Sequence, residues 1–351
     1  MKKLWMALGI VGAVSLAGAF TASCFASDPD GDLLKKAKQY FKPLPKEMPA
    51  PKDNPTTKEK VALGKKLYYD PRLSLSGVIS CNTCHNLATY GVDNLPSSLG
   101  HKFLTGGRNA PTVLNAGFHI AQFWDGRAKT LEEQAKGPIL AHVEMAMPNP
   151  DFVVLKLKTI PGYVEEFKKV FPNEKDPLTY DNIAKAIAAF ERTLTTPSRF
   201  DKFLQGDKNA LTKKEKEGLR LFIDKGCAGC HNGVAVGGTM FTKFGVVKPY
   251  PTADLGKYRV TKKEEDKFVF KVPSLRNIAM TYPYFHDGQV WDLKKAVKIM
   301  GETQLGIKLT DEETDAIVAF LNSLTGDVSE EARTMPILPP STPETPKPKA
   351  D

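Results

Sequence analysis

The sequence predicts a mainly α-helical protein that folds as two similar domains. The first observation behind this prediction is a Cys-x-x-Cys-His motif that occurs twice, at residues 81–85 and 227–231. The second is an internal repeat, in which the same helix and loop motifs surround both copies. The chain has 351 residues, 41% hydrophobic and 25% charged, which is the length of two domains and the composition of a globular protein.

The repeat consists of a helix before each Cys-x-x-Cys-His motif, two loop motifs after it and an amphipathic closing helix. The closing helices carry apolar residues three and four positions apart, as a helix with one buried face requires. Start signals precede the helices, including a capping-box pattern at residues 212–215. The paired segments are 64–68 and 218–222, 111–115 and 273–277, 123–126 and 285–288, and 187–190 and 317–320.

The limits of the domains follow from the repeat and from composition. We expect an N-terminal domain at residues 27–204 and a C-terminal domain at residues 205–327. Residues 328–351 are rich in proline, which favours an extended or disordered chain, and we expect a disordered tail there.

The first residues have the pattern of a secretory signal peptide. Lys2 and Lys3 precede an apolar run at residues 4–20, and small residues follow it. We therefore predict a signal peptide at residues 1–26 and export to the periplasm. A retained membrane anchor is the alternative, since the run is close to the shortest length that spans a bilayer. Lipidation of Cys24 is a further alternative, although the residues before it lack the usual large aliphatic side chain.

The Cys-x-x-Cys-His motif is the attachment signal of a c-type haem. Two thiols three positions apart can each form a thioether bond to a haem vinyl group, and the next histidine can ligate the iron. A redox dithiol, a zinc site and a disulfide are the alternatives. Two copies in an exported chain favour haem, which also uses every cysteine except Cys24. The residues so assigned are Cys81, Cys84 and His85 in the first motif and Cys227, Cys230 and His231 in the second. The predicted fold class is thus mainly α, with two cytochrome c-like domains, each built around one covalently bound haem.

Met300 is our candidate for the sixth ligand of the second haem. It lies shortly before the predicted closing helix, and a thioether opposite a histidine raises the reduction potential of the iron. Met280 is the competing ligand, and a methionine that only fills the core is the other alternative.

His101 is our candidate for the sixth ligand of the first haem, where no methionine occupies a matching place. It lies in a glycine-containing segment, residues 95–107. A loop histidine can reach the iron and can also move away, which would open a site for a substrate. Ligation by two histidines gives a lower potential than ligation by histidine and methionine. A surface histidine is the alternative, and His119, His142 and His286 are further candidate ligands.

The net charge of +9 is spread along the chain rather than gathered in a basic stripe with aromatic residues. Such a distribution is typical of a solvated surface. Each haem would also add two propionates, which offset part of the charge. We therefore do not expect a nucleic-acid partner.

At these residues the chain resembles the bacterial dihaem cytochrome c peroxidases, a family that includes the related MauG-type enzymes. The resemblance runs from Thr57 to Gly326. Besides both Cys-x-x-Cys-His motifs, it rests on segments 107–112, 122–127, 143–145 and 281–288. MauG-type enzymes carry tyrosine where this chain has Met300, so the chain is more similar to the peroxidases.

The resemblance implies a role for each haem and its ligands. His85 and His101 resemble the ligands of a low-potential haem that reacts with peroxide, with His101 released on activation. His231 and Met300 resemble the ligands of a high-potential haem that transfers electrons.

Three further side chains acquire roles from the same resemblance. Gln134 and Glu144 resemble the polar pair at the peroxide site. An amide there can donate a hydrogen bond to bound peroxide, and a carboxylate can move a proton between its two oxygens. Trp124 resembles the tryptophan between the two haems. The alternatives are a surface glutamate and glutamine, and a tryptophan that only packs at an interface.

The resemblance also implies a calcium ion at the domain interface. Asn109, Thr281 and Pro283 resemble its ligands, the last two through their backbone carbonyls. The chain departs from the family pattern just before Glu144, where a polar residue and a proline are more typical. His142 in this place either perturbs the acid–base behaviour of Glu144 or is simply exposed.

The implied activity is reduction of hydrogen peroxide to water with electrons from small exported cytochromes c or cupredoxins. The enzyme would be activated when its high-potential haem is reduced, and a homodimer is also implied. The main alternative is a dihaem electron-transfer cytochrome without peroxidase turnover, which would need the haem ligands but not Gln134 and Glu144. A protein-modifying dihaem oxygenase is a third alternative, which Met300 argues against.

Overall fold

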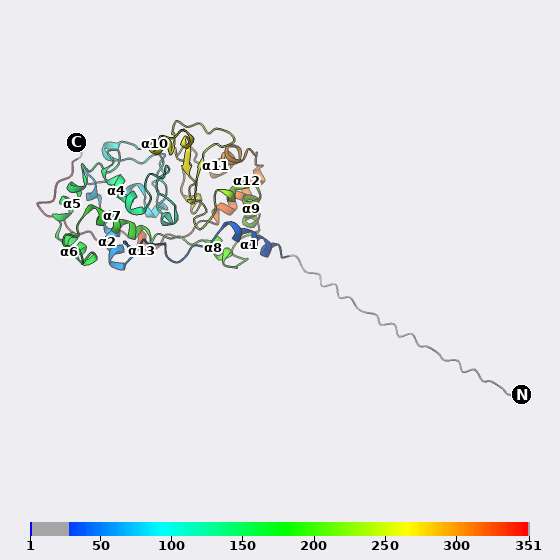
Figure 1. Cartoon of the computed structure of the whole chain (residues 1–351), viewed down its shortest axis with the longest axis horizontal. Helices are drawn as coiled ribbons and strands as arrows, with labels where there is room; N and C mark the ends of the chain where they lie inside the picture. The colour runs from blue at the N-terminus through cyan, green and yellow to red at the C-terminus, as the bar shows by residue number, and fades with distance from the viewer. Residues whose placement is uncertain (2–27, 350–351) are drawn as a thin grey trace.

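Helices dominate the computed structural model, which describes Met1 and residues 28–349. They form two lobes that lie side by side, and a short two-stranded sheet lies in the C-terminal lobe (Figure 1). The predicted mainly α fold is confirmed. Apart from Met1, the predicted signal peptide, with Cys24, lies outside the described residues. Within the described residues no helix is both long and apolar enough to cross a membrane.

The N-terminal domain is built on a pair of crossed helices. α2 (Lys58–Tyr69) packs against α7 (Tyr180–Glu191), and their apolar faces form the core of the domain. A threonine at each N-cap accepts a hydrogen bond from the backbone of its own helix, which explains where both helices begin. The remaining helices on this core are α3 (Cys81–Cys84), α4 (Leu131–Leu140), α5 (Pro150–Lys158), α6 (Pro161–Val170) and α13 (Glu330–Arg333).

The C-terminal domain repeats this crossing with α9 (Lys213–Asp224) and α12 (Asp311–Asn322). Both helices begin at a threonine capping box, as the sequence predicts for α9. The strands β1 (Phe241–Lys243) and β2 (Val269–Lys271) pair antiparallel. The remaining helices on this side are α1 (Pro29–Tyr40), α8 (Arg199–Leu204), α10 (Tyr258–Thr261) and α11 (Leu293–Met300).

One glycine in each domain lets the crossed helices touch. A Cβ atom on Gly64 would lie 1.8 Å from the carbonyl oxygen of Ala186, and one on Gly218 would lie 1.8 Å from that of Ala316. Backbones can approach this closely only where a side chain is absent. The repeated glycine of the sequence is therefore the residue that sets the helix crossing.

The aromatic residues beside the crossing match as well. Tyr68 meets Phe190 with ring centroids 5.3 Å apart, and Phe222 meets Phe320 at the same distance, 5.3 Å. The two domains therefore share one packing arrangement, residue for residue.

A single threonine joins the two halves of the repeat. Asn115 and Asn277, which occupy equivalent positions in the repeat, each donate a side-chain hydrogen bond of 2.8 Å to Thr196 Oγ1. All three residues are buried. Thr196 therefore lies at the point where the two domains meet.

The beginning of the chain crosses to the other domain, which differs from the predicted boundaries. α1 lies within predicted residues 27–204, but Leu33, Ala37 and Phe41 pack into the C-terminal core. α8 belongs to the same core. The apolar stripe of α1 finds its complementary surface beside α9, so the packing units do not follow the predicted limits of 27–204 and 205–327.

The end of the chain crosses in the opposite direction. Residues 328–349 form a strap on the N-terminal domain instead of the predicted disordered tail. Ala332 is buried in the N-terminal core, and its carbonyl accepts a hydrogen bond of 2.8 Å from the hydroxyl of Tyr69. Near the end, the amide of Lys349 donates to the carbonyl of Leu75 at 2.9 Å. After α13, the prolines between residues 336 and 348 exclude a helix and a central strand but allow an extended chain. The other polar groups of this chain bond to the domain beneath.

Candidate haem and peroxide sites

The second Cys-x-x-Cys-His motif borders an apolar cavity of the C-terminal domain. Cys227, Cys230 and His231 line this cavity, and so does Met300, the last residue of α11. Burial lowers the pKa of His231 to about 4, so the ring is neutral, which is the form that binds iron. Met280 is 39% exposed and is not among the residues that line the cavity. The structure thus brings Met300, rather than Met280, to the second motif.

Two basic side chains line the same cavity with no acidic side chain to neutralise them. Lys271 Nζ lies 3.2 Å from His119 Nδ1, and His119 Nε2 is buried without a hydrogen-bond partner among the described residues. Burial lowers the pKa of Lys271 to about 8 and the pKa of His119 well below its ordinary value. Haem propionates would supply the missing negative charge. The residues of this cavity therefore fit a haem.

The first motif lies on α3 and the residue that follows it. Burial raises the pKa of the Cys84 thiol to about 11 and lowers the pKa of His85, which leaves the imidazole neutral. His85 Nδ1 lies 3.3 Å from the carbonyl oxygen of Gly91, a contact that orients the ring. The hydroxyl of Tyr68 donates to the His85 carbonyl at 2.6 Å. The chain thus holds the histidine of this motif from both its ring and its backbone.

His101 is held beside Glu144 by its backbone. The short helix η3 (His101–Phe103) begins at this residue, and the amide of His101 donates to the carbonyl of Glu144 at 2.8 Å. Gly100 passes so close to Val143 that a Cβ atom would lie 1.9 Å from its carbonyl oxygen. The His101 ring is only 3% exposed, and its Nδ1 has no hydrogen-bond partner in the described part of the chain. His101 is therefore an inward-facing residue and not a surface histidine.

Glu144 belongs to the loop whose backbone holds His101. Burial raises the pKa values of the Cys81 and Cys84 thiols, and the negative charge of Glu144 adds a little to this rise. Burial raises the pKa of Glu144 itself, and the positive charge of Arg127 partly opposes this. The carboxyl is thus half-buried and is not that of a fully exposed surface glutamate.

The two other polar residues of this region are placed differently. Gln134 is half-buried on α4, the helix that leads into the loop of Glu144. His142 is exposed, and it contributes nothing to the pKa shift of Glu144. The structure therefore supports the simpler of the two alternatives for His142.

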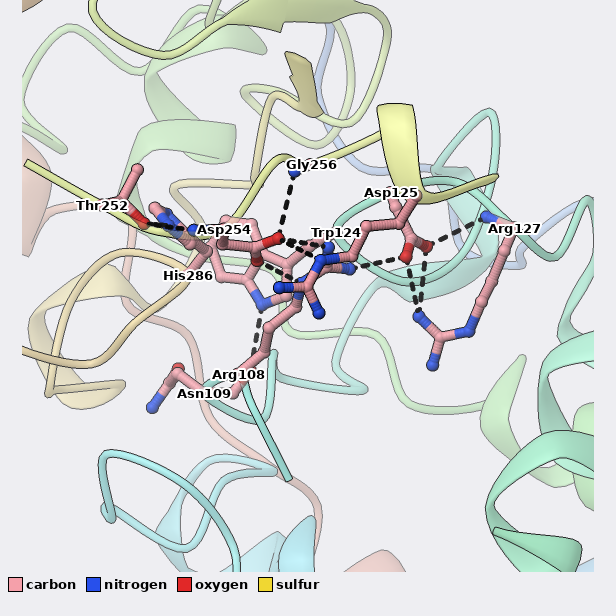
Figure 2. Close-up of polar contacts among 10 residues, drawn as sticks. Arg108, Asn109, Trp124, Asp125, Arg127, Thr252, Asp254, Gly256 and His286 are labelled. Atoms are coloured by element: carbon pink, nitrogen blue, oxygen red, sulfur yellow. Dashed lines mark hydrogen bonds and ion pairs between the residues drawn. The ribbon is translucent and has the colours of Figure 1, made fainter. Parts of the chain in front are cut away.

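Trp124 lies in a polar network that links the two domains (Figure 2). Its indole Nε1 donates to the carbonyl of Asn109 at 2.9 Å. Arg108 forms ion pairs of 2.6 Å with Asp125 of the N-terminal domain and Asp254 of the C-terminal domain. Trp124 also lines the cavity of the second motif. Trp124 is therefore a residue of the N-terminal domain that reaches the cavity of the C-terminal domain.

The three predicted calcium ligands lie around this cavity. Asn109, Thr281 and Pro283 all line it, and Asn109 Nδ2 donates to the carbonyl of Leu95 at 2.9 Å, which fixes the amide. Among the described residues no three His, Cys, Asp or Glu side chains gather as a metal cluster. A cation here would rest on amide and carbonyl oxygens, which calcium accepts as ligands.

Comparison with known proteins identifies the family. Residues 58–209 match the family model of di-haem cytochrome c peroxidase, and residues 215–325 match that of cytochrome c. The cytochrome c551 peroxidase of Pseudomonas aeruginosa is 50% identical over 322 residues, which cover 90% of this chain and 92% of that protein. The chain belongs to the dihaem cytochrome c peroxidase family.

Other relatives agree with this assignment. The cytochrome c551 peroxidase of Nitrosomonas europaea is 52% identical to this dihaem peroxidase over 296 residues, or 84% of this chain and 87% of that protein. The crystal structure of a MauG-like protein associated with microbial copper homeostasis superposes with a TM-score of 0.76 at 30% identity, covering 84% of this chain and 98% of that one. The predicted resemblance is confirmed, and the two matched domains support two c-type haems.

Sequence reasoning missed part of the cavity of this dihaem peroxidase. It weighed His119 only as an iron ligand and did not single out Lys271. The available signal was a single lysine within an otherwise apolar segment, residues 268–272. His286, another candidate ligand, instead bonds through Nε2 to Thr252 Oγ1 at 2.9 Å and stacks on Phe270.

Proposed function

We propose that this dihaem peroxidase reduces hydrogen peroxide to water at its N-terminal haem, with electrons from small exported cytochromes c or cupredoxins. One observation carries the proposal: the amide of His101 is bonded to the carbonyl of Glu144, a half-buried acidic residue in the loop that follows α4. The histidine that would release the iron is thus directly coupled to the group that would move the proton. The names of the relatives from P. aeruginosa and N. europaea support peroxidase activity.

The haems supply an iron site where peroxide binds and a store for one of the two electrons that the reduction needs. His85 and His101 would hold the N-terminal haem, and His231 and Met300 the C-terminal one. Because the thioether of Met300 favours the reduced iron, the C-terminal domain would hold the stored electron.

Glu144 is the group that moves a proton between the two peroxide oxygens. Its carboxylate takes the proton of the near oxygen and its carboxylic acid returns that proton to the leaving oxygen. Burial brings its pKa closer to neutral, which suits a group that must work in both forms. Gln134 donates a hydrogen bond from Nε2 to the bound peroxide.

His101 closes the site until the C-terminal haem has been reduced. The closed arrangement is supported by the buried ring and by the bond to Glu144. Lys102 and Phe103, which follow it, have positive φ angles of 54° and 59°, an unfavourable conformation for such residues. Departure of His101 would relieve this conformation and break the bond to Glu144, so one movement would open the iron and free the acid–base residue.

Trp124 assists electron transfer between the haems. A calcium ion bound by Asn109, Thr281 and Pro283 holds the Trp124 side chain in place. The support is the hydrogen bond from the Trp124 indole to the carbonyl of Asn109. Chelation of calcium should therefore slow electron transfer between the haems, and readdition of calcium should restore it. A stopped-flow trace that is unchanged by a chelator would contradict this role.

Export and assembly complete the proposed function. The basic and apolar pattern of residues 1–26 supports a signal peptide and a periplasmic location. The family resemblance supports a homodimer, which size-exclusion chromatography with light scattering would detect.

The main test compares two redox states of the purified holoprotein. In one sample ascorbate reduces only the C-terminal haem, and the other sample stays fully oxidised. Peroxide and a reduced small cytochrome c are then added, and oxidation of the donor is followed. We expect rapid turnover in the first sample alone. No turnover in either sample, with both haem spectra intact, would favour the electron-transfer cytochrome instead.

A variant isolates the proposed switch. His101→Gly should turn over peroxide without pre-reduction, because the ligand that closes the iron is gone. His142→Gly is the matched control, an exposed histidine near Glu144 that should still need pre-reduction. A continued need for pre-reduction in His101→Gly would contradict the proposed release of His101, while the peroxidase assignment would stand.

A further inference from the structure

Two positions beside the helix crossing carry different chemistry in the two domains. Since Gly64 and Gly218 make the same contacts, Tyr68 in the N-terminal domain is equivalent to Phe222 in the C-terminal domain. On the closing helices, the residue after the paired phenylalanines is Glu191 in α7 and Leu321 in α12. The N-terminal domain is thus polar at two positions where the C-terminal domain is apolar.

In the C-terminal domain both of these positions face the haem cavity. Phe222 and Leu321 line it together with Cys227 and His231. Because the crossing is the same, Tyr68 and Glu191 must border the corresponding space of the N-terminal domain.

Direct contacts in the N-terminal domain agree with this placement. The Tyr68 hydroxyl donates to the carbonyl of His85. Glu191 lies on α7, which packs against α2, the helix of Tyr68. Burial raises the pKa values of Cys81 and Tyr68, and the charge of Glu191 adds to this rise, in agreement with this placement.

Glu191 is a buried ionisable residue. It is 4% exposed, and burial raises the pKa of its carboxyl to about 8. An ionisable group in a protein interior destabilises the fold, whereas the leucine of the other domain does not. Such groups gather at functional sites.

The charges around Glu191 leave it able to titrate. Arg192, next to it on α7, lowers its pKa, but this guanidinium is engaged by Glu132 of α4 at 2.7 Å, and Glu132 raises the pKa of Glu191. Tyr68 of α2 and Cys81 of α3 are the other ionisable groups nearby, and the thiol is consumed when haem is attached.

We propose that Glu191 is a proton site of the N-terminal haem, which takes up one proton from solvent when that haem gains one electron. The electron comes from a one-electron donor, the proton adds to the Glu191 carboxylate, and no bond of the haem changes. This inference rests on the proposed function only in assigning the N-terminal haem to peroxide.

The physical basis is the charge of the carboxylate in a medium of low dielectric constant. A negative charge near the iron favours the oxidised state, and protonation removes it. The reduction potential of the N-terminal haem therefore falls as pH rises through the pKa of Glu191. By linkage, reduction of the same haem raises the proton affinity of Glu191 by the same factor. Leu321 supplies no titrating group to the C-terminal haem, so a pH dependence of that haem near pH 8 would come from Lys271 and would not change in a Glu191 variant.

The test is a potentiometric titration of both haems in the holoprotein, followed by visible spectroscopy on either side of pH 8, near the Glu191 pKa of about 8. In the wild type the midpoint of the N-terminal haem should fall with pH. In Glu191→Gln, which keeps the shape and removes the titration, this fall should disappear. The C-terminal midpoint should be the same in both proteins at every pH. An equal slope for the N-terminal haem in Glu191→Gln and wild type would overturn the proposal.

A second measurement needs no variant. At a pH above 8, where Glu191 is a carboxylate in the oxidised protein, the reduced-minus-oxidised infrared spectrum of the wild type should gain a protonated-carboxyl band when the N-terminal haem is reduced. The band should be absent when only the C-terminal haem is reduced. Its absence in both spectra would also overturn the proposal. Loss of peroxide turnover has no bearing on either readout, so failure of the peroxidase function and failure of the proton site are distinguishable.

Discussion

The N-terminal and C-terminal domains share one helix crossing but surround it with different side chains. The glycine contacts and ring distances beside the crossing are the same in both. In the C-terminal domain, Phe222, Leu321 and Met300 line the cavity. In the N-terminal domain the equivalents of Phe222 and Leu321 are the polar residues Tyr68 and Glu191. Backbone packing thus fixes the scaffold, while the side chains that surround the crossing differ between the two domains.

The largest effect should come from removing the proton-moving group of the N-terminal site. Glu144→Gln keeps the shape but cannot exchange a proton, so we expect peroxide turnover to fall by about 10²–10⁴-fold. Steady-state oxidation of the donor measures it. The control is Glu165→Gln on the exposed side of α6, which should leave the rate unchanged. Full activity in Glu144→Gln would remove the main chemical difference between the domains.

The next effect concerns a buried ion pair that only the C-terminal repeat contains. Arg276 makes two hydrogen bonds, of 2.8 and 2.9 Å, with Asp201, while the equivalent residue of the N-terminal repeat is Leu114. Arg276→Leu would make the repeats alike but leave Asp201 as a buried unpaired charge. We expect a loss of about 3–5 kcal/mol in the stability of the C-terminal domain, measured by urea unfolding.

Its control and its pH dependence sharpen this prediction. Arg259→Leu removes an arginine whose side chain is 58% exposed and should cost at most about 1 kcal/mol. The charge of Arg276 lowers the pKa of Asp201, so the pair stabilises the fold above the unfolded pKa of the carboxyl and loses this effect as pH falls. A variant that unfolds like the wild type at neutral pH would show that the pair is dispensable.

A smaller effect tests whether the crossings are equivalent. Gly64→Ala and Gly218→Ala each place a Cβ atom 1.8 Å from a backbone oxygen, so the helices must separate. We expect each to cost about 1–3 kcal/mol, by a similar amount in the two domains. Gly107→Ala, where no atom lies within 4 Å of the added Cβ atom, is the control and should not destabilise. A large effect in one domain alone would break the comparison.

The smallest effect expected near neutral pH is on the pH dependence of kcat/KM for peroxide turnover. Glu144 must begin the reaction as a carboxylate, so kcat/KM should fall as pH drops through its pKa. Because burial raises this pKa, the fall should begin at a higher pH than for an ordinary glutamate. Measurements of kcat/KM against pH with the C-terminal haem kept reduced would test this. A profile that is flat down to the ordinary range of a glutamate pKa would contradict the burial of this group.

The sequence by itself determined the haem motifs, the repeat and the helices of the repeat. These are local patterns: thiols three positions apart, apolar residues at helical spacing, and threonine caps, and each acts through neighbours along the chain. Position in the chain made Met300 and His101 candidate ligands, with a core methionine and a surface histidine as alternatives. The structure places Met300 on the cavity of the second motif and buries His101.

Only the tertiary structure decided the features that join distant residues. The pairing of His119 with Lys271 spans 152 positions, and Glu191 is 4% exposed in a domain where α7 packs against α2 from a distant part of the chain. Composition also does not show that α1 packs on the C-terminal domain and residues 328–349 on the N-terminal domain. An apolar stripe or a run of prolines does not specify which surface it will cover. Periodicity says which face of a segment is buried, but the partner of that face is set by the packing of the whole chain.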